Sequence, residues 1–161
     1  MALHEANRSR LETPKAAIAL PTDLREVTKP MKKQYLNPDG LWKPSGYTQV
    51  ISTTGGTTVY IAGQPAYDTE GKVVAPGDLR QQMEHAFANA TVALKAVGAS
   101  WADVVRVVSY VVDYQPAHRA MLNEVRTKYI GDHPPTSTLV GVQALGQSGA
   151  VFEIDVTAVV G

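Results

Sequence analysis

The strongest pattern in the chain is a run of apolar residues at helical spacing near its middle. Apolar side chains recur every three or four positions at Leu79, Met83, Ala86, Phe87, Ala90, Leu94 and Val97. This spacing is typical of one buried face of an amphipathic helix. Asp78 stands at the position of an N-cap, and Gly98 stands where a helix commonly ends in a left-handed residue. The sequence therefore predicts a helix over 79–97.

Shorter runs before this helix have the alternation of β-strands. They lie at 34–36, 47–53 and 57–62. Gly55 and Gly56 separate the last two runs, and two alternating runs joined by a glycine pair are typical of a β-hairpin. We therefore expect the second and third strands to pair with each other.

The second half of the chain continues with a strand and another helix. Residues 104–112 are β-branched almost throughout, which favours a strand covered on both faces. Pro116 favours the start of a second helix, which we expect to end at Gly131. The apolar positions that share one face of this helix are Met121, Leu122, Val125 and Tyr129.

Two further strands, at 137–145 and 151–160 and paired through a turn at 146–149, complete the order β-β-β-α-β-α-β-β. Two amphipathic helices on one face of a single mixed sheet are the two-layer solution for this order, an α+β fold. The other sheet face would be uncovered, and we expect its residues to be too apolar for water. Its burial then requires a partner, most simply another copy of the chain.

Composition narrows the function classes. Hydrophobic residues make up 44% and charged residues 19% of the 161 residues, ordinary values for one soluble globular domain. The 15 basic residues only balance the 15 acidic ones, whereas a nucleic-acid binder needs a clustered excess of cations. The chain has no Cys, which excludes disulfides, thiolate nucleophiles and Cys-ligated metals. Without a long apolar run or a secretory signal, the expected location is the cytoplasm, away from membranes.

Residues 1–30 differ from the rest of the chain. They mix charges, contain Pro14, Pro21 and Pro30, and have no aromatic residue. Such a segment cannot bury enough apolar surface to fold alone. We therefore expect an N-terminal extension over 1–30 and a single domain over 31–161.

Few side chains suggest chemistry. The histidines have no metal-ligand spacing, and they are His4, His85, His118 and His133. The strand at 151–160 places Glu153 and Asp155 on the face opposite its apolar residues. One interpretation is that these acids lie on a polar face of the strand that is exposed to solvent. If that face instead closes on a neighbouring subunit, desolvation would raise the pKa of Glu153 toward the range useful for general acid–base catalysis.

Six short features, in this order, resemble the RidA/YjgF/UK114 (Rid) family. They are YTQV at 47–50, YIAGQ at 60–64, Asn89 within the helix, DVV at 103–105, PPTSTLV at 134–140 and FEID at 152–155. The resemblance covers residues 31–161 and implies a chorismate-mutase-like (RidA-type) fold, a homotrimer and clefts between its subunits. For the archetypal branch it also implies hydrolysis of reactive enamines and imines, such as 2-imino acids, to 2-oxo acids and ammonia without a cofactor or metal.

The resemblance also implies a site. Tyr47 matches a cleft tyrosine, and Asn123 matches an asparagine near the cleft. Gly63, followed by Gln64, matches a backbone N–H donor. Glu153 matches the glutamate that positions or protonates the attacking water.

One position departs from the archetype. Ser137 and Thr138 match positions that bind the substrate, but at position 137 the archetype has an arginine that binds the substrate carboxylate through two hydrogen bonds. A serine hydroxyl cannot replace such a charged contact, which is worth about 2–5 kcal/mol. We therefore expect a substrate other than simple 2-iminopropanoate.

Three functions remain open. The first is an imine or enamine hydrolase whose substrate is neutral, or whose carboxylate is held across the interface by Arg119, Arg126 or Lys128. The second is a non-catalytic trimer that binds a small metabolite and has a regulatory or buffering role. The third is an endoribonuclease, which zero net charge and 7% aromatic residues disfavour. The presence of Glu153 favours the first.

Overall fold

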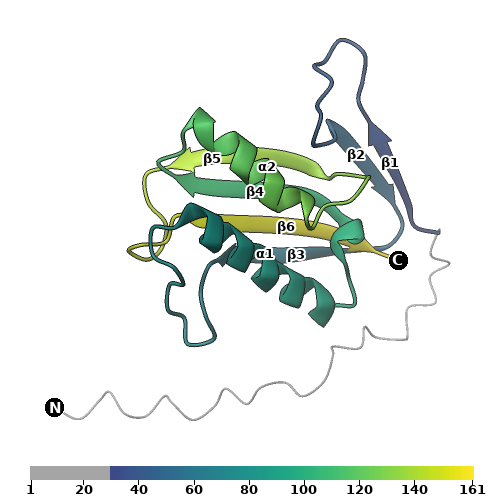
Figure 1. Cartoon of the computed structure of the whole chain (residues 1–161). Helices are drawn as coiled ribbons and strands as arrows, with labels where there is room; N and C mark the ends of the chain where they lie inside the picture. The colour runs from purple at the N-terminus through teal and green to yellow at the C-terminus, as the bar shows by residue number, and fades with distance from the viewer. Residues whose placement is uncertain (1–29) are drawn as a thin grey trace.

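The computed structural model describes residues 30–161, which form two layers (Figure 1). The expected N-terminal extension over 1–30, which includes His4, lies outside the described residues except for Pro30. The strands are β1 (Lys32–Leu36), β2 (Val50–Thr54), β3 (Thr57–Pro65), β4 (Val104–Val112), β5 (Thr136–Val142) and β6 (Phe152–Val160). The helices are α1 (Leu79–Ala96) and α2 (Arg119–Thr127), with short 3-10 turns at Trp101–Asp103 and Pro116–His118. Both helices lie on one face of a mixed sheet, so the expected α+β fold is confirmed.

The strand order of the main sheet is β3-β6-β4-β5. β6 pairs antiparallel with both β3 and β4, and β5 pairs parallel with β4. The expected pairing of β5 with β6 is therefore wrong. The glycine-containing segment after β5 does turn the chain. The chain then passes β4 and enters the centre of the sheet as β6, between β3 and β4. There β6 buries Phe152, Ile154 and Val156 beneath α1 and has a hydrogen-bonded neighbour on each side.

The expected hairpin of β2 and β3 is also wrong. β2 pairs with β1, whereas β3 pairs with β6. The strands β1 and β2 thus form a separate ladder that projects from the main sheet, instead of joining it (Figure 1). Gly55 and Gly56, with φ of 70° and 75°, redirect the chain from one ladder to the other. A Cβ on Gly56 would stand 2.7 Å from the Val160 carbonyl oxygen, so only glycine fits this bend.

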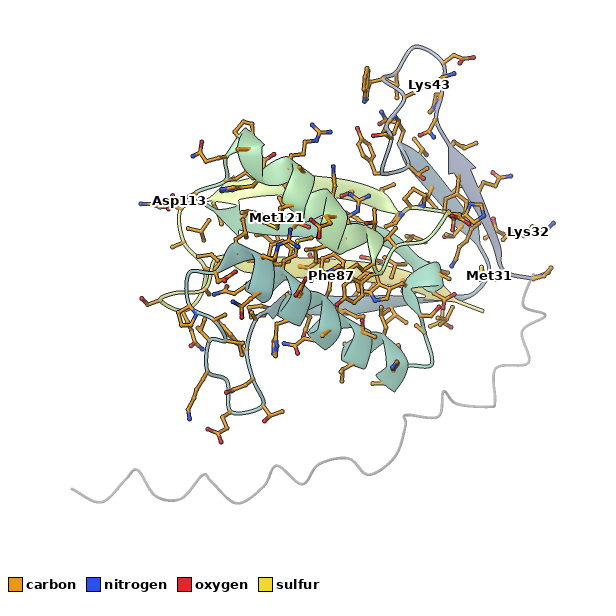
Figure 2. All side chains as sticks on the ribbon, viewed as in Figure 1. Met31, Lys32, Lys43, Phe87, Asp113 and Met121 are labelled. Atoms are coloured by element: carbon orange, nitrogen blue, oxygen red, sulfur yellow. The ribbon has the colours of Figure 1, made fainter. Side chains whose placement is uncertain are left out.

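Helix α1 forms where the pattern predicts it. Asp78 caps it by accepting a hydrogen bond from the Gln81 N–H at 2.9 Å, and Gly98 follows its end with φ of 71°. Its buried face centres on Phe87, whose ring lies 5.1 Å from that of Trp101 (Figure 2). Val97, expected on the buried face, is 39% exposed because the helix has already ended there.

Helix α2 is shorter than expected. The helical path starts at Pro116 as predicted, but α2 ends at Thr127, before Gly131. Leu122 and Val125 are buried as the apolar spacing predicts. The short helix lies beside α1, in front of β4 and β5 (Figure 1).

The face of the main sheet turned away from the helices is mixed in character, so the expectation of an apolar face is wrong. Residues that are direct partners in the strand register share a face. This face carries the apolar residues Val108, Val112, Val140, Val142 and Val159 together with Tyr60, Arg106, Tyr110, Thr136, Thr138, Glu153, Asp155 and Thr157. Tyr60 is 83% exposed. The β-branched run in β4 concealed Arg106 and Tyr110, which strand alternation places on this outer face. That another copy of the chain buries this outer face of the sheet stays a prediction.

Candidate functional site

The residues implied by the resemblance divide between two pockets on opposite faces of the sheet. Tyr47, Asn123 and Ser137 line a pocket of about 270 Å³ between α2 and the sheet, here called the helix-side pocket. Gly63 and Glu153 line a shallow depression on the face turned away from the helices, here called the outer pocket. One chain therefore does not bring all the predicted residues together.

The outer pocket is organised by a β-bulge in β3. The register between β3 and β6 shifts between Ile61 and Gln64, so Gly63 lies at the bulge. A Cβ on Gly63 would overlap Oε1 of Glu153. The bulge and the missing side chain together let the Glu153 carboxylate lie against the β3 backbone.

The electrostatic environment of Glu153 favours its neutral form. Partial burial, and then the nearby Asp155 carboxylate, raise the pKa of Glu153 above its ordinary value. Tyr110 pairs with Glu153 in the register and borders the same pocket. A raised pKa strengthens the tendency of a carboxyl group to hold a proton that it can donate, while its second oxygen accepts a hydrogen bond from water.

Two of the implied residues belong to neither pocket. The Gln64 side chain donates a hydrogen bond of 3.0 Å to the Ala62 carbonyl and so serves the bulge itself. Thr138 is exposed on the outer face, opposite Val108. Because adjacent residues of a strand point to opposite faces, Thr138 cannot share a pocket with Ser137 in the same chain.

The helix-side pocket is closed at one end by the loop that joins β1 to β2. Thr48 is buried, and its hydroxyl donates to the Pro134 carbonyl at 2.6 Å while its N–H donates to the Pro135 carbonyl at 3.1 Å. These bonds hold the loop against the start of β5. As a result Tyr47 and Ser137, far apart in the sequence, border one pocket.

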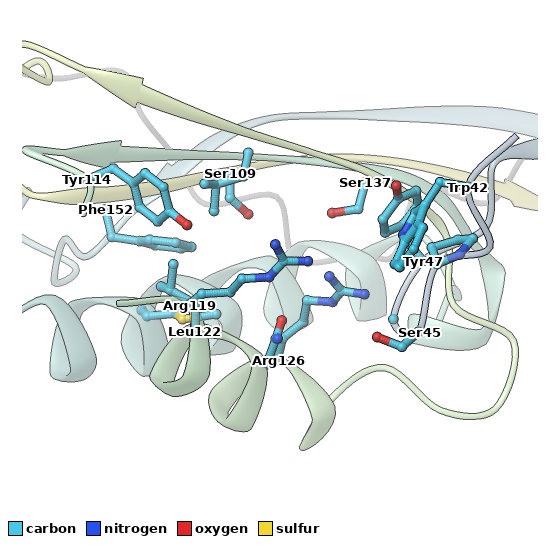
Figure 3. A pocket seen from close by; sticks show the side chains of 15 residues that line it. Trp42, Ser45, Tyr47, Ser109, Tyr114, Arg119, Leu122, Arg126, Ser137 and Phe152 are labelled. Atoms are coloured by element: carbon cyan, nitrogen blue, oxygen red, sulfur yellow. The ribbon is translucent and has the colours of Figure 1, made fainter. Parts of the chain in front are cut away.

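Two arginines from α2 line the same pocket. Arg119, Asn123 and Arg126 follow one another at i, i+4 and i+7, the spacing of one helix face. Figure 3 shows both guanidinium groups extending from α2 toward the strand that carries Ser137. Within one chain these arginines share a pocket with Tyr47 and Ser137 and lie apart from Glu153. The suggestion that they reach the substrate across a subunit interface stays a prediction. The third suggested cation, Lys128, instead donates to Glu84 at 2.8 Å.

Other polar residues have structural roles. His85 Nε2 lies 3.1 Å from the Tyr67 carbonyl oxygen, and the Asn89 amide donates to the Pro65 and Tyr67 carbonyls at 3.1 and 3.0 Å. His118 Nδ1 accepts from the Gln115 N–H at 3.2 Å. Within residues 30–161 no group of three or more His, Cys, Asp or Glu side chains could hold a metal ion.

In the same part of the chain, no helix combines the length and the apolar character needed to cross a membrane.

Comparisons with known proteins agree on one family. The family model described as endoribonuclease L-PSP matches residues 42–160. A RutC family protein of Pyrococcus abyssi is 33% identical over 116 residues, which are 71% of this chain and 88% of the relative. A 2-iminobutanoate/2-iminopropanoate deaminase of Dermatophagoides farinae is 27% identical over 129 residues, 79% of this chain and 90% of the relative.

The fold comparison points the same way. A crystal structure of the Rid-family protein YyfB from Yersinia pestis matches with a TM-score of 0.73 and 34% identity, over 80% of this chain and 98% of that one. The match in sequence thus coincides with the two-layer architecture and extends through β6, which carries Glu153. The chain therefore belongs to the Rid family of RidA-like proteins, the family of the endoribonuclease L-PSP model.

Proposed function

We propose that the protein hydrolyses a reactive imine or enamine to a carbonyl compound and ammonia. The observation that carries this proposal is Glu153, a partly buried carboxyl group of raised pKa that lies against the Gly63 backbone. The name of the Dermatophagoides farinae relative, an imine deaminase, supports the same chemistry. Ser137 supports a substrate other than simple 2-iminopropanoate.

The proposed reaction needs one proton donor and one water molecule. Neutral Glu153 protonates the imine nitrogen to give an iminium ion, and an enamine reaches the same ion by taking the proton on its β-carbon. The carboxylate then accepts a proton from water as the water oxygen bonds to the former imine carbon. Return of that proton to nitrogen lets the carbon–nitrogen bond break as the carboxylate takes up the proton of the new hydroxyl group. This step releases ammonia, leaves the carbonyl group and restores neutral Glu153.

The division of the site supports a homotrimer as the working unit. Tyr47 and Ser137 border the helix-side pocket, whereas Glu153 lies on the other face of the same sheet. A small molecule can contact both sets only if a neighbour contributes one of them. We therefore place the site in a cleft between copies, with Gly63 and Glu153 from one copy and Tyr47 from the next. Sedimentation at micromolar concentration should give a trimer, and a stable monomer would contradict this arrangement.

Activity is tested by ammonia release from imines of varied charge, generated in situ. Glu153→Gln should leave assembly intact and lower the rate by roughly 100- to 10,000-fold, because the transferable proton is lost. Glu70→Gln is the matched control, since Glu70 is exposed and its one ion pair within residues 30–161 is with Lys72 at 2.6 Å. An unchanged rate in Glu153→Gln would remove Glu153 from the mechanism.

A metabolite-binding trimer is the second candidate, favoured by the well-formed helix-side pocket that contains no acidic residue. It takes first place if small metabolites bind but no imine yields ammonia. Cleavage of RNA is not proposed, because the 15 basic and 15 acidic residues leave no excess of cations for a phosphate backbone.

A further inference from the structure

The helix-side pocket contains two cations with no acid beside them. Arg119 and Arg126 both line it, and neither forms an ion pair with any acid in the described part of the chain. The acidic residues of the two helices are already paired with other cations. Glu124 of α2 accepts two hydrogen bonds from Arg80, at 2.9 and 2.7 Å, and Glu84 of α1 accepts one from Lys128 at 2.8 Å.

This arrangement carries an electrostatic cost at Arg126. Arg126 is partly buried, and this burial lowers the pKa of its guanidinium because no nearby carboxylate compensates for the lost water. Its Nη2 reaches across to the loop, 3.6 Å from where a Cβ on Gly46 would stand. Arg119 lies seven residues away, about 10 Å along the same helix face, and is exposed, so water screens most of its repulsion with Arg126. An anion in the pocket that both arginines line would offset the cost of burying Arg126.

The other walls indicate which anion fits. Asn123 stands between the two arginines on α2, and Ser137 borders the pocket from β5, so both offer hydrogen-bond donors. Tyr114 and Phe152 form an aromatic end of the pocket, seen to the left in Figure 3. The cavity of about 270 Å³ is the size for a small molecule with an apolar portion, not for a polymer.

We propose that the helix-side pocket binds the carboxylate of a small organic acid through Arg119 and Arg126, with the apolar part of the acid against Tyr114 and Phe152. Arginine suits this role because its planar group donates two parallel hydrogen bonds to a carboxylate. The guanidinium groups that bind the carboxylate thus come from α2, on the pocket wall opposite Ser137. This inference deepens the proposed function, and the identification of the bound acid as the substrate rests on that function.

The test uses benzoylformate, a stable 2-oxo acid, and its neutral amide as a matched pair in titration calorimetry on the full chain. The acid should bind, and the amide should bind roughly 10- to 100-fold more weakly, the range for hydrogen bonds to a charged group. Arg119→Gln and Arg126→Gln should each weaken binding of the acid by a similar factor. Lys95→Gln is the control, because Lys95 is exposed at the end of α1 and its loss changes the net charge equally.

Thermal unfolding separates this role from a structural one. Because each arginine is unpaired, the Gln variants should unfold at the wild-type temperature or above it in the absence of ligand, and benzoylformate should raise the unfolding temperature of the wild type more than theirs. Equal affinity for acid and amide, or unchanged binding by both Gln variants, would overturn the inference. Arginine-dependent binding without ammonia release from any imine would instead reject the proposed function and keep the inference. If instead ammonia is released at the same rate when either arginine is replaced, the proposed function is kept and the role of the arginines in binding the substrate is rejected.

Discussion

The carboxylate of Glu153 occupies the space that a side chain on Gly63 would need. Gly63 has no left-handed backbone angle, so its lack of a side chain is required by this contact and not by its conformation. The glycine and the β-bulge around it therefore leave room beside β3 for Glu153, the one acid that the proposed chemistry uses.

Gly63→Ala should destabilise the protein by about 1–3 kcal/mol, the usual cost of a forced overlap in packed structure. The cost should largely vanish in a Glu153→Ala background, because the group that is overlapped is gone. Urea unfolding of the four proteins of this double-mutant cycle measures the coupling. An equal cost of Gly63→Ala in both backgrounds would show that the contact does not restrict position 63.

The raised pKa of Glu153 predicts a pH dependence of stability. The folded protein holds this proton more tightly than the unfolded chain, whose glutamates titrate at about 4.3. The folded state therefore loses stability as the pH rises from that value through the higher pKa of the folded state, and the loss is constant above it. Glu153→Gln removes this titration.

The free energy of unfolding of Glu153→Gln, minus that of the wild type, should thus increase from about pH 4 upward and then level off. Urea unfolding at a series of pH values measures this difference. A difference that falls as the pH rises would mean that the pKa of Glu153 is lowered in the folded protein.

Gln82 has a structural role that the sequence pattern did not reveal. Its fully buried amide donates to the Ala75 and Gly149 carbonyls at 3.0 and 2.6 Å, and its Oε1 accepts from the Val151 N–H at 2.7 Å. Gln82→Ala removes all three bonds and leaves the Val151 N–H without a partner, whereas the Ala75 and Gly149 carbonyls still accept from the Asp78 and Gly77 N–H groups. The variant should therefore cost about 1–3 kcal/mol. Gln81→Ala on the exposed side should cost less than about 1 kcal/mol, as thermal or urea unfolding would show. Equal losses would contradict the assignment.

Ser137→Arg should gain at most weak activity on 2-iminopropanoate. The new guanidinium would enter the pocket that already holds Arg119 and Arg126, so like-charge repulsion should also lower the unfolding temperature. Adding Arg126→Gln should restore part of the lost stability. Ammonia release and thermal unfolding of the single and double variants check both points, and robust turnover by Ser137→Arg alone would show that only an arginine at this position was missing.

The sequence by itself determined the features that depend on local periodicity. The bounds of β4, the cap and buried face of α1 and the position of Glu153 opposite the apolar face of β6 all follow from spacings of two or 3.6 residues. The Rid family was likewise recognisable from short segments in order. The position of the domain boundary near residue 30 stays a prediction.

Only the tertiary structure decided which segments meet. Glycine turns mark where the chain changes direction, but burial of distant residues decides the neighbour of each strand, and so β6 lies between β3 and β4. The same applies to the site. Strand alternation separates Ser137 from Glu153 by the thickness of the sheet, and the packing of α2 over β5 brings Arg119 and Arg126 to Ser137. These contacts join residues far apart in the chain, and no local spacing encodes them.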